Sequence, residues 1–178
     1  MRRLLKLIFY AVVLVSSAKK ANGQSSKNLL RLVTDTTKDE YAYVDVKGDT
    51  LIPFGKYLLC YTEEFDEFAI VRSKDKGLIG IDREENILFN VYVFDNGPDY
   101  PSDGLFRIVK DGKIGYANSS GQVVIQPQFD CAYPFMNGKA KVGKGCKENT
   151  DGEHRWWTEG TWYMINRKGK VLKAKQSR

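Results

Sequence analysis

The sequence predicts an all-β protein: about three to four β-hairpin or three-strand repeats of about 36 residues, stacked side by side in a solenoid-like or barrel-like array behind a signal-peptide helix. A turn motif recurs along the chain, the segments around it alternate or run apolar as short strands do, and no segment shows a convincing 3.6-residue period. With 178 residues and 42% hydrophobic content, the chain fits one domain or a short repeat array with a buried core.

Residues 1–23 have the pattern of a secretory signal peptide. A basic start without acids comes before an apolar run, 7–15, which ends in small residues. As a helix that run spans about 14 Å, whereas a bilayer core is about 30 Å thick. Cleavage fits before Gln24 or at residues 16–18, and a retained amphipathic anchor or a buried N-terminal element are the alternatives. We therefore expect an exported protein of the periplasm, cell envelope or extracellular space, with membrane contact only through this segment if it stays uncleaved.

The remaining chain divides by composition and pattern. Residues 24–40 are expected to form an N-terminal tail or capping segment, and the repeat domain covers 41–173. Within it, residues 143–160 form a polar insertion, and 174–178 form a frayed basic tail.

Each repeat is centred on a turn that an Asp or Asn side chain begins by bonding to backbone two residues ahead. These turn residues are Asp45, Asp82, Asn118 and Asn166, separated by 37, 36 and 48 residues. In three copies a glycine follows at the position that needs a positive φ, namely Gly48, Gly121 and Gly169. In the second copy Asn86 is expected to take this left-handed conformation, because Asn tolerates it best after glycine.

Strands are predicted on both sides of each turn. Residues 41–46 and 50–52 flank the first one, and a further apolar or alternating segment precedes each later turn, at 68–71, 104–109 and 138–142. Each repeat therefore holds about three strands. Because one such unit cannot cover its own apolar face, neighbouring units are expected to stack.

The third copy is the most regular, and it resembles a known repeat. Residues 111–116 read DGKIGY, 121–130 read GQVVIQPQFD and 135–142 read FMNGKAKV. This is similar to the WG repeat (KWG repeat) family, whose units run Gly-Lys-Trp-Gly-Tyr-Ile-Asp, a turn Gly, Val-Ile-Pro, Tyr-Asp and Phe-x-x-Gly-x-Ala-x-Val. Ile79 and Ile114 stand where that family has Trp, and Trp162 is followed by Tyr163 instead of Gly. The resemblance implies a binding or scaffold role without shared catalytic residues, often in bacterial exported or cell-envelope proteins.

The insertion supplies the candidate binding surface: Arg155, Trp156, Trp157 and Glu159. Neighbouring residues of a strand point to opposite faces, so at most one of the two tryptophans packs inward. An exposed Trp beside charged residues can stack on a sugar or on an aromatic side chain of a partner. The alternative is structural, with one Trp in the core and the other covering a sheet edge.

Few residues suggest catalysis or metal binding. His154 is the single histidine and lies in a charged loop without a nucleophile motif, so neither cofactor nor metal is expected. Carboxylates cluster at 63–67 and 82–85, where the alternatives are solvated loops or the acid pair of a hydrolase. The primary expectation is a non-catalytic module that binds a protein or glycan partner. The alternative is a carboxylate-dependent envelope hydrolase acting on a polysaccharide.

Cysteine and charge usage set two further limits. Cys60, Cys131 and Cys146 allow at most one internal disulfide, and Cys131 with Cys146 is the first pair to test, since it would tie down the insertion. The formal charge is +6, but five of the 28 basic residues lie in 1–23, which leaves 23 against 22 acidic residues. Such a balance gives no electrostatic footprint for nucleic acid.

Overall fold

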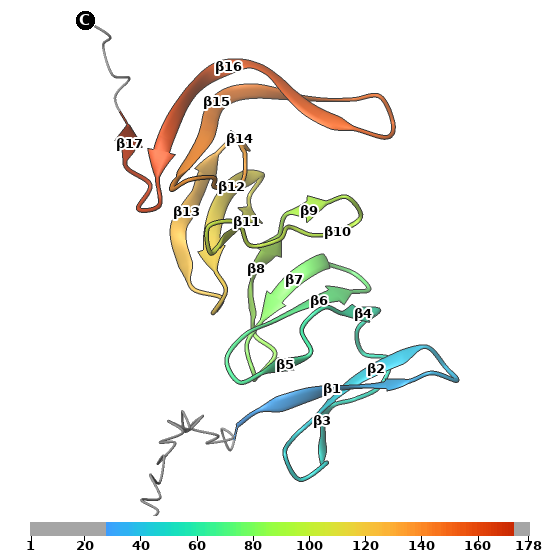
Figure 1. Cartoon of the computed structure of the whole chain (residues 1–178). Coiled ribbons are helices and arrows are strands. Elements are labelled where there is room, and N and C mark those ends of the chain that lie inside the picture. The colour runs from blue at the N-terminus through green and yellow to red at the C-terminus, as the bar shows by residue number, and fades with distance from the viewer. Residues whose placement is uncertain (1–27, 173–178) are drawn as a thin grey trace, which may run out of the picture.

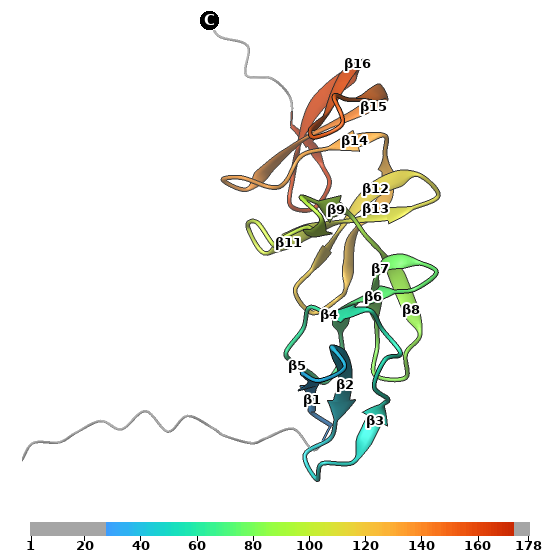
Figure 2. The same ribbon diagram turned by 90° about the vertical axis from the view of Figure 1, so that its right-hand side faces the viewer.

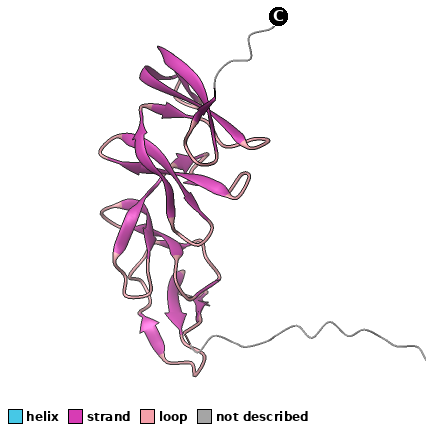
Figure 3. Ribbon diagram, turned by 90° about the vertical axis from the view of Figure 1, so that its left-hand side faces the viewer, coloured by secondary structure: helices cyan, strands magenta, loops and turns pink. Residues whose placement is uncertain are grey.

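A computed structural model describes residues 28–172, which form strands β1 to β17 and no helix (Figures 1 and 3). The all-β prediction is confirmed for this part of the chain. The expected signal peptide, 1–23, and the basic tail, 174–178, lie outside the described residues. Within 28–172 there is also no helix long and apolar enough to span a membrane.

Twelve of the strands form four consecutive antiparallel meanders of three strands each. The first is β1 (Leu30–Asp35), β2 (Glu40–Val44) and β3 (Thr50–Ile52); the second is β6 (Ala69–Ser73), β7 (Gly77–Ile81) and β8 (Ile87–Val91). The third is β11 (Leu105–Lys110), β12 (Lys113–Asn118) and β13 (Val123–Phe129); the fourth is β15 (Lys139–Thr150), β16 (Arg155–Asn166) and β17 (Val171–Leu172). Short strands connect them: β4 (Leu59–Cys60), β5 (Glu64–Phe65), β9 (Val93–Phe94), β10 (Gly97–Pro98) and β14 (Cys131–Ala132).

The meanders follow one another along an elongated molecule. A four-stranded sheet in the order β3-β2-β1-β5 holds the first, and another in the order β14-β15-β16-β17 holds the fourth. The second and third share a seven-stranded sheet, β13-β12-β11-β8-β7-β6-β4, joined where β8 pairs with β11. In Figure 2 the chain climbs from the first meander at the bottom to the fourth at the top. Sequence neighbours are therefore spatial neighbours.

The same hydrogen-bonded turn closes the second hairpin of every meander. The N–H of the Asp or Asn donates to the carbonyl four residues on, and its carbonyl accepts from the N–H three residues on, in all four copies. The residue three positions after the Asp or Asn therefore takes the positive φ; these residues are Gly48, Glu85, Gly121 and Gly169. The expectation for Asn86 was wrong, because these bonds fix the offset at three residues, where the second copy has Glu85 at φ 64°. Asn86 instead donates its backbone N–H and its side-chain amide to the Asp82 carboxylate.

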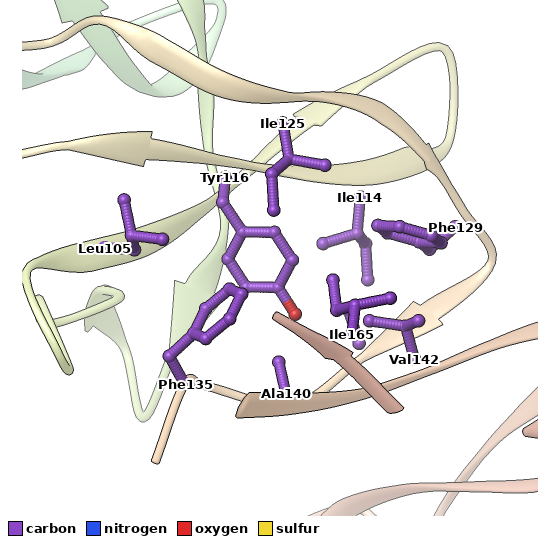
Figure 4. Packing of buried hydrophobic residues seen from close by; sticks show 10 residues of the cluster. Leu105, Ile114, Tyr116, Ile125, Phe129, Phe135, Ala140, Val142 and Ile165 are labelled. Atoms are coloured by element: carbon purple, nitrogen blue, oxygen red, sulfur yellow. The ribbon is translucent and has the colours of Figure 1, made fainter. Parts of the chain in front are cut away.

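The hydrophobic core is divided into three clusters, each lying between two consecutive meanders. The cluster between the first and second includes Leu30, Tyr43, Val71 and Ile81, and that between the second and third includes Phe89, Val91, Phe106 and Ile108. The cluster between the third and fourth surrounds Tyr116 (Figure 4) and contains Leu105, Ile114, Ile125, Phe129, Ala132, Phe135, Ala140, Val142 and Ile165. The clusters are shared in the way expected of stacked repeats, so the burial of one meander depends on its neighbours.

Gly115 shows why the most regular copy needs its glycine beside Ile114. A Cβ at this position would lie 2.5 Å from the carbonyl oxygen of Ile125 and from the nitrogen of Pro127, both in the neighbouring β13. Those atoms belong to backbone and cannot rotate away. The glycine therefore permits the close approach of β13 at the register shift between β12 and β13.

The expected polar insertion is mostly strand instead of loop. β15 and β16 pair in one register from Lys139–Asn166 out to Thr150–Arg155, interrupted only at Gly145 and Gly160, so residues 143–160 form the outer part of one long hairpin, here called the hairpin arm (Figure 1). Most of this arm projects past the core, so most of its side chains are polar and exposed, and no hydrophobic alternation in the sequence marks its strands. At the other end of the chain, the segment 24–40 contains β1, which pairs with both β2 and β5.

Candidate functional site

The hairpin arm separates the two tryptophans of the predicted surface. Trp157 is half-buried and packs against the core between the third and fourth meanders. Trp156, the preceding residue, is 43% exposed and has no aromatic contact among the described residues. Arg155 and Glu159 are both exposed, and Glu159 forms an ion pair with Lys147 across the arm. The four predicted residues therefore do not form one contiguous face.

Trp157 belongs to a larger set of rings, here called the aromatic cluster: Tyr92, Tyr133, Trp157 and Trp162. The ring centroids of Tyr92 and Trp157 are 6.2 Å apart, those of Trp157 and Tyr133 are 5.3 Å apart, and those of Tyr133 and Trp162 are 5.7 Å apart. Tyr133 is 40% exposed, and the other three are half-buried. Rings from three separate segments thus form a continuous aromatic surface.

A buried ion pair supports this surface from below. Asp99 and Arg107 are each only 3% exposed, and both Asp99 oxygens accept from the guanidinium, at 2.6 and 2.9 Å. Asp99 also accepts from the backbone N–H of Arg107, and the guanidinium donates to the carbonyl of Ala132. The guanidinium carbon lies 4.1 Å from the ring centroid of Tyr92. The pair therefore fixes the position of Tyr92 from the side that faces the protein.

Nothing in the sequence signals this pair. Asp99 lies in residues 95–103, which look like a surface connector, and Arg107 lies in an alternating strand where a charged residue suggests the solvent face. In the structure the β9–β10 hairpin covers that face, and Asp99 follows β10 directly. An acidic and a basic residue eight positions apart are too common in sequences for this spacing to reveal a buried ion pair without knowledge of the fold.

A cation also lies over the opposite end of the aromatic cluster. The Lys141 ammonium is 4.6 Å from the ring centroid of Trp162 and 5.9 Å from that of Tyr133. Near Tyr92, burial raises the pKa of the phenol, while the Arg107 charge opposes this and Glu148 adds to it. The Tyr92 phenol therefore stays protonated at physiological pH.

Two links hold the base of the hairpin arm. A disulfide joins Cys131 to Cys146, whose Cα atoms are 6.1 Å apart, and the third cysteine, Cys60, is free. A Cβ at Gly143 would lie 2.7 Å from both sulfur atoms, so this glycine makes room for the bridge. In addition, the Asp130 carboxylate accepts from the Gly145 N–H at 2.7 Å and pairs with Lys113, and these contacts lower the pKa of Asp130.

Reducing the disulfide is expected to destabilise the fourth meander. Closing a loop of about 15 residues is worth about 3 kcal/mol in the chain-entropy model. Cys131→Ser/Cys146→Ser should lose a similar free energy of unfolding, measured by urea denaturation. Cys60→Ser provides the control, since that thiol makes no bridge. If the double variant matches the control, the bridge does not stabilise the arm.

The carboxylates of the first predicted cluster border a cavity. Glu64, Asp66 and Glu67 line a space of about 310 Å³ together with Ser119, Ser120 and an apolar floor that includes Phe106. All three carboxylates are exposed, and Glu64 pairs with Arg31. The cavity lies between the second and third meanders, and none of its lining residues belongs to the hairpin arm.

The second predicted carboxylate cluster, residues 82–85, lies at a hairpin tip. Asp82 holds the turn, and the Glu85 carboxylate accepts from Lys56 at 2.7 Å and from the Tyr57 hydroxyl at 2.9 Å. Asp82 is therefore engaged in its own turn, and Glu85 joins the second meander to the segment that follows the first. The structure does not bring this cluster together with Glu64, Asp66 and Glu67 in one cavity.

The remaining acidic, histidine and cysteine side chains of the described part of the chain form no metal site. No three His, Cys, Asp or Glu side chains within 28–172 are arranged to hold a metal ion. His154 is exposed and lies against Asp151 in the tip of the hairpin arm. Burial raises the pKa of the Cys60 thiol to about 11, so it stays protonated and weakly nucleophilic at neutral pH.

Comparison with known proteins identifies one family. Residues 114–147 match the WG-containing repeat, which spans β12 to β14 and the first part of β15. The predicted resemblance is confirmed, and it falls on the copy that carries most of the pattern. No curated protein and no solved structure is significantly similar to the chain.

Proposed function

Since the chain carries a WG-containing repeat, we propose that its four meanders are four WG-like copies that form a non-catalytic binding module, exported to the bacterial cell envelope. The partner is a protein or a glycan. The contact face is the aromatic cluster with the adjoining residues of the hairpin arm, because loops and projecting hairpins on a rigid frame are where such surfaces occur.

One observation carries this proposal: four rings from distant segments form a partly exposed surface that is held in place before any ligand binds. Isolated exposed aromatics are common, but here the disulfide, the Asp99–Arg107 pair and the stacked core fix the positions of the rings. A pre-organised surface loses little conformational entropy when it binds. Tyr and Trp suit this role because their rings offer a large contact area together with a polar group.

Export is supported by two independent features. Residues 1–23 have the composition of a signal peptide, and the disulfide is a bond typical of oxidising compartments.

The purified protein should capture its partner from envelope extract through the aromatic cluster. Trp157→Ala and Tyr133→Ala each remove one ring, and we expect capture to fall at least tenfold in both variants. Trp156→Ala is the matched control, because its ring lies on the other face of the same strand. Thermal melts show whether each variant remains folded. Loss of capture in Trp156→Ala alone would place the contact on the opposite face.

The cavity beside Glu64, Asp66 and Glu67 favours a second candidate, a carboxylate-dependent hydrolase acting on an envelope polysaccharide. Its apolar floor and hydroxyl groups resemble the lining of small-molecule sites. Release of reducing ends by the wild-type protein but not by Asp66→Asn or Glu67→Gln would support this candidate over the binding module.

A further inference from the structure

The burial of equivalent strand positions in the four meanders shows which sheet faces are covered by the next meander along the chain. In β2, β7, β12 and β16, the residue two positions before the turn residue pairs with one residue of the preceding strand in its meander. These partners are Leu32, Ile70, Arg107 and Lys141 respectively. Leu32 packs against the first core cluster and Ile70 against the second, and Arg107 is buried with Asp99. Lys141 is exposed. The fourth meander thus carries a cation at a position that is covered in the other three.

The neighbouring positions show the same change. Lys139 lies opposite Asn166 and is exposed, whereas Leu105, at the same position opposite Asn118, is buried. Met164 is 39% exposed, whereas Tyr116, at its position in the third meander, is fully buried. We call the face formed by Tyr133, Lys139, Lys141, Trp162 and Met164 the end surface.

The charge of the chain is also divided at this point. Residues 28–130 contain 11 Lys and Arg against 18 Asp and Glu, whereas residues 131–172 contain eight against four. Lys139 and Lys141 have no carboxylate partner among the described residues. The end surface is therefore a positive region on an otherwise acidic array, and its cations are available to an anionic ligand.

One ammonium group of this surface lies against two of its rings. The Lys141 ammonium lies over Trp162 and within 5.9 Å of the Tyr133 centroid, so an anion held by Lys141 belongs to a group that also touches these rings. A pyranose that carries a carboxylate meets both requirements: its C–H face stacks on a ring, and its carboxylate accepts charge-assisted hydrogen bonds from lysine.

We infer that the end surface binds an acidic polysaccharide through sugar rings stacked on Tyr133 and Trp162 and carboxylates paired with Lys139 and Lys141. This inference rests on the proposed binding function and names its ligand class. Nucleic acid fits less well, because a phosphate backbone requires a continuous basic track, and the adjoining meanders are net acidic.

Binding of defined polymers to the purified protein tests the inference. Alginate, a polymer of uronates, should bind at least tenfold more tightly than pullulan, a neutral glucan, in biolayer interferometry at low salt. Lys139→Gln/Lys141→Gln should weaken alginate binding about a hundredfold, or tenfold for each ammonium, and Tyr133→Ala should weaken it about tenfold. Lys47→Gln/Lys74→Gln removes two exposed lysines elsewhere and should change nothing.

Four results would overturn the inference. Equal affinity for alginate and pullulan would show that charge plays no part, and binding of oligothymidylate as tight as that of alginate would point to nucleic acid. Alginate binding that survives the end-surface lysine variant would place the ligand elsewhere. If no polymer binds but envelope partners are still captured through the aromatic cluster, the ligand class is wrong and the binding module stands. If capture fails as well, both proposals fall.

Discussion

Tyr116→Ala is expected to lower the free energy of unfolding by about 3 to 5 kcal/mol, the range for removing a large buried ring. The Tyr116 side chain is fully buried at the centre of the core between the third and fourth meanders (Figure 4). Its ring makes an edge contact with Phe135, with centroids 4.7 Å apart, and its hydroxyl donates to the Tyr133 carbonyl at 2.7 Å. Urea denaturation followed by tryptophan fluorescence measures the change.

Tyr116→Phe separates the two contributions of this residue. It keeps the ring and removes only the hydroxyl, so we expect a loss of about 1 kcal/mol. Tyr43→Phe offers a second comparison, since Tyr43 holds the same place in the first meander and donates to the Thr62 carbonyl. A loss in Tyr116→Phe as large as in Tyr116→Ala would mean that the hydrogen bond, and not the packing, dominates. Equal stability of Tyr116→Ala and the wild type would contradict the shared core.

Asp99→Ala is expected to cost about 3 to 5 kcal/mol of stability, because it leaves a buried guanidinium without its carboxylate. The backbone N–H of Arg107 loses its acceptor in the same change. Arg107→Leu should be destabilising for the converse reason, since it leaves the Asp99 carboxylate buried and unpaired. Both effects are measured as changes in the midpoint of urea unfolding.

The double variant Asp99→Ala/Arg107→Leu is the decisive control. Removing both charges leaves no unpaired ion, so its loss should be well below the sum of the two single losses. Leu32 and Ile70 stand at the equivalent position in the first two meanders, which shows that an apolar residue fits there. Strictly additive losses would mean that the two side chains act independently. The same variants should also weaken partner capture, because Arg107 holds Tyr92 in place.

Local chemistry made the repeat readable in the sequence. Each turn depends on bonds between a residue and its third and fourth successors, and Asp or Asn followed by glycine is the pattern that such bonds require. Strand positions were visible where hydrophobic and polar residues alternate because one face is buried, as at the start of β15. The same local rule, applied at the correct offset, also identifies Glu85 as the left-handed residue.

The hairpin arm shows where this kind of pattern ends. Apart from Trp157, its outer residues pair strand to strand without a core beneath them, so no hydrophobic alternation marks them as strands. Trp156 and Trp157 stood out by composition, but the sequence could not say which of them would join other rings. That choice was made by Tyr92 and Tyr133, which are 65 and 24 residues away from Trp157 along the chain.

By itself, the sequence determined the all-β class, the four turn residues and the resemblance to WG repeats, because each depends on residues only a few positions apart. The tertiary structure alone decided the three shared cores, the buried Asp99–Arg107 pair and the aromatic cluster. These features depend on how one meander stacks on the next, and they join residues that are distant in the chain. The proposed ligand surface has the same origin, since Lys139 and Lys141 are exposed only because no described meander covers the fourth.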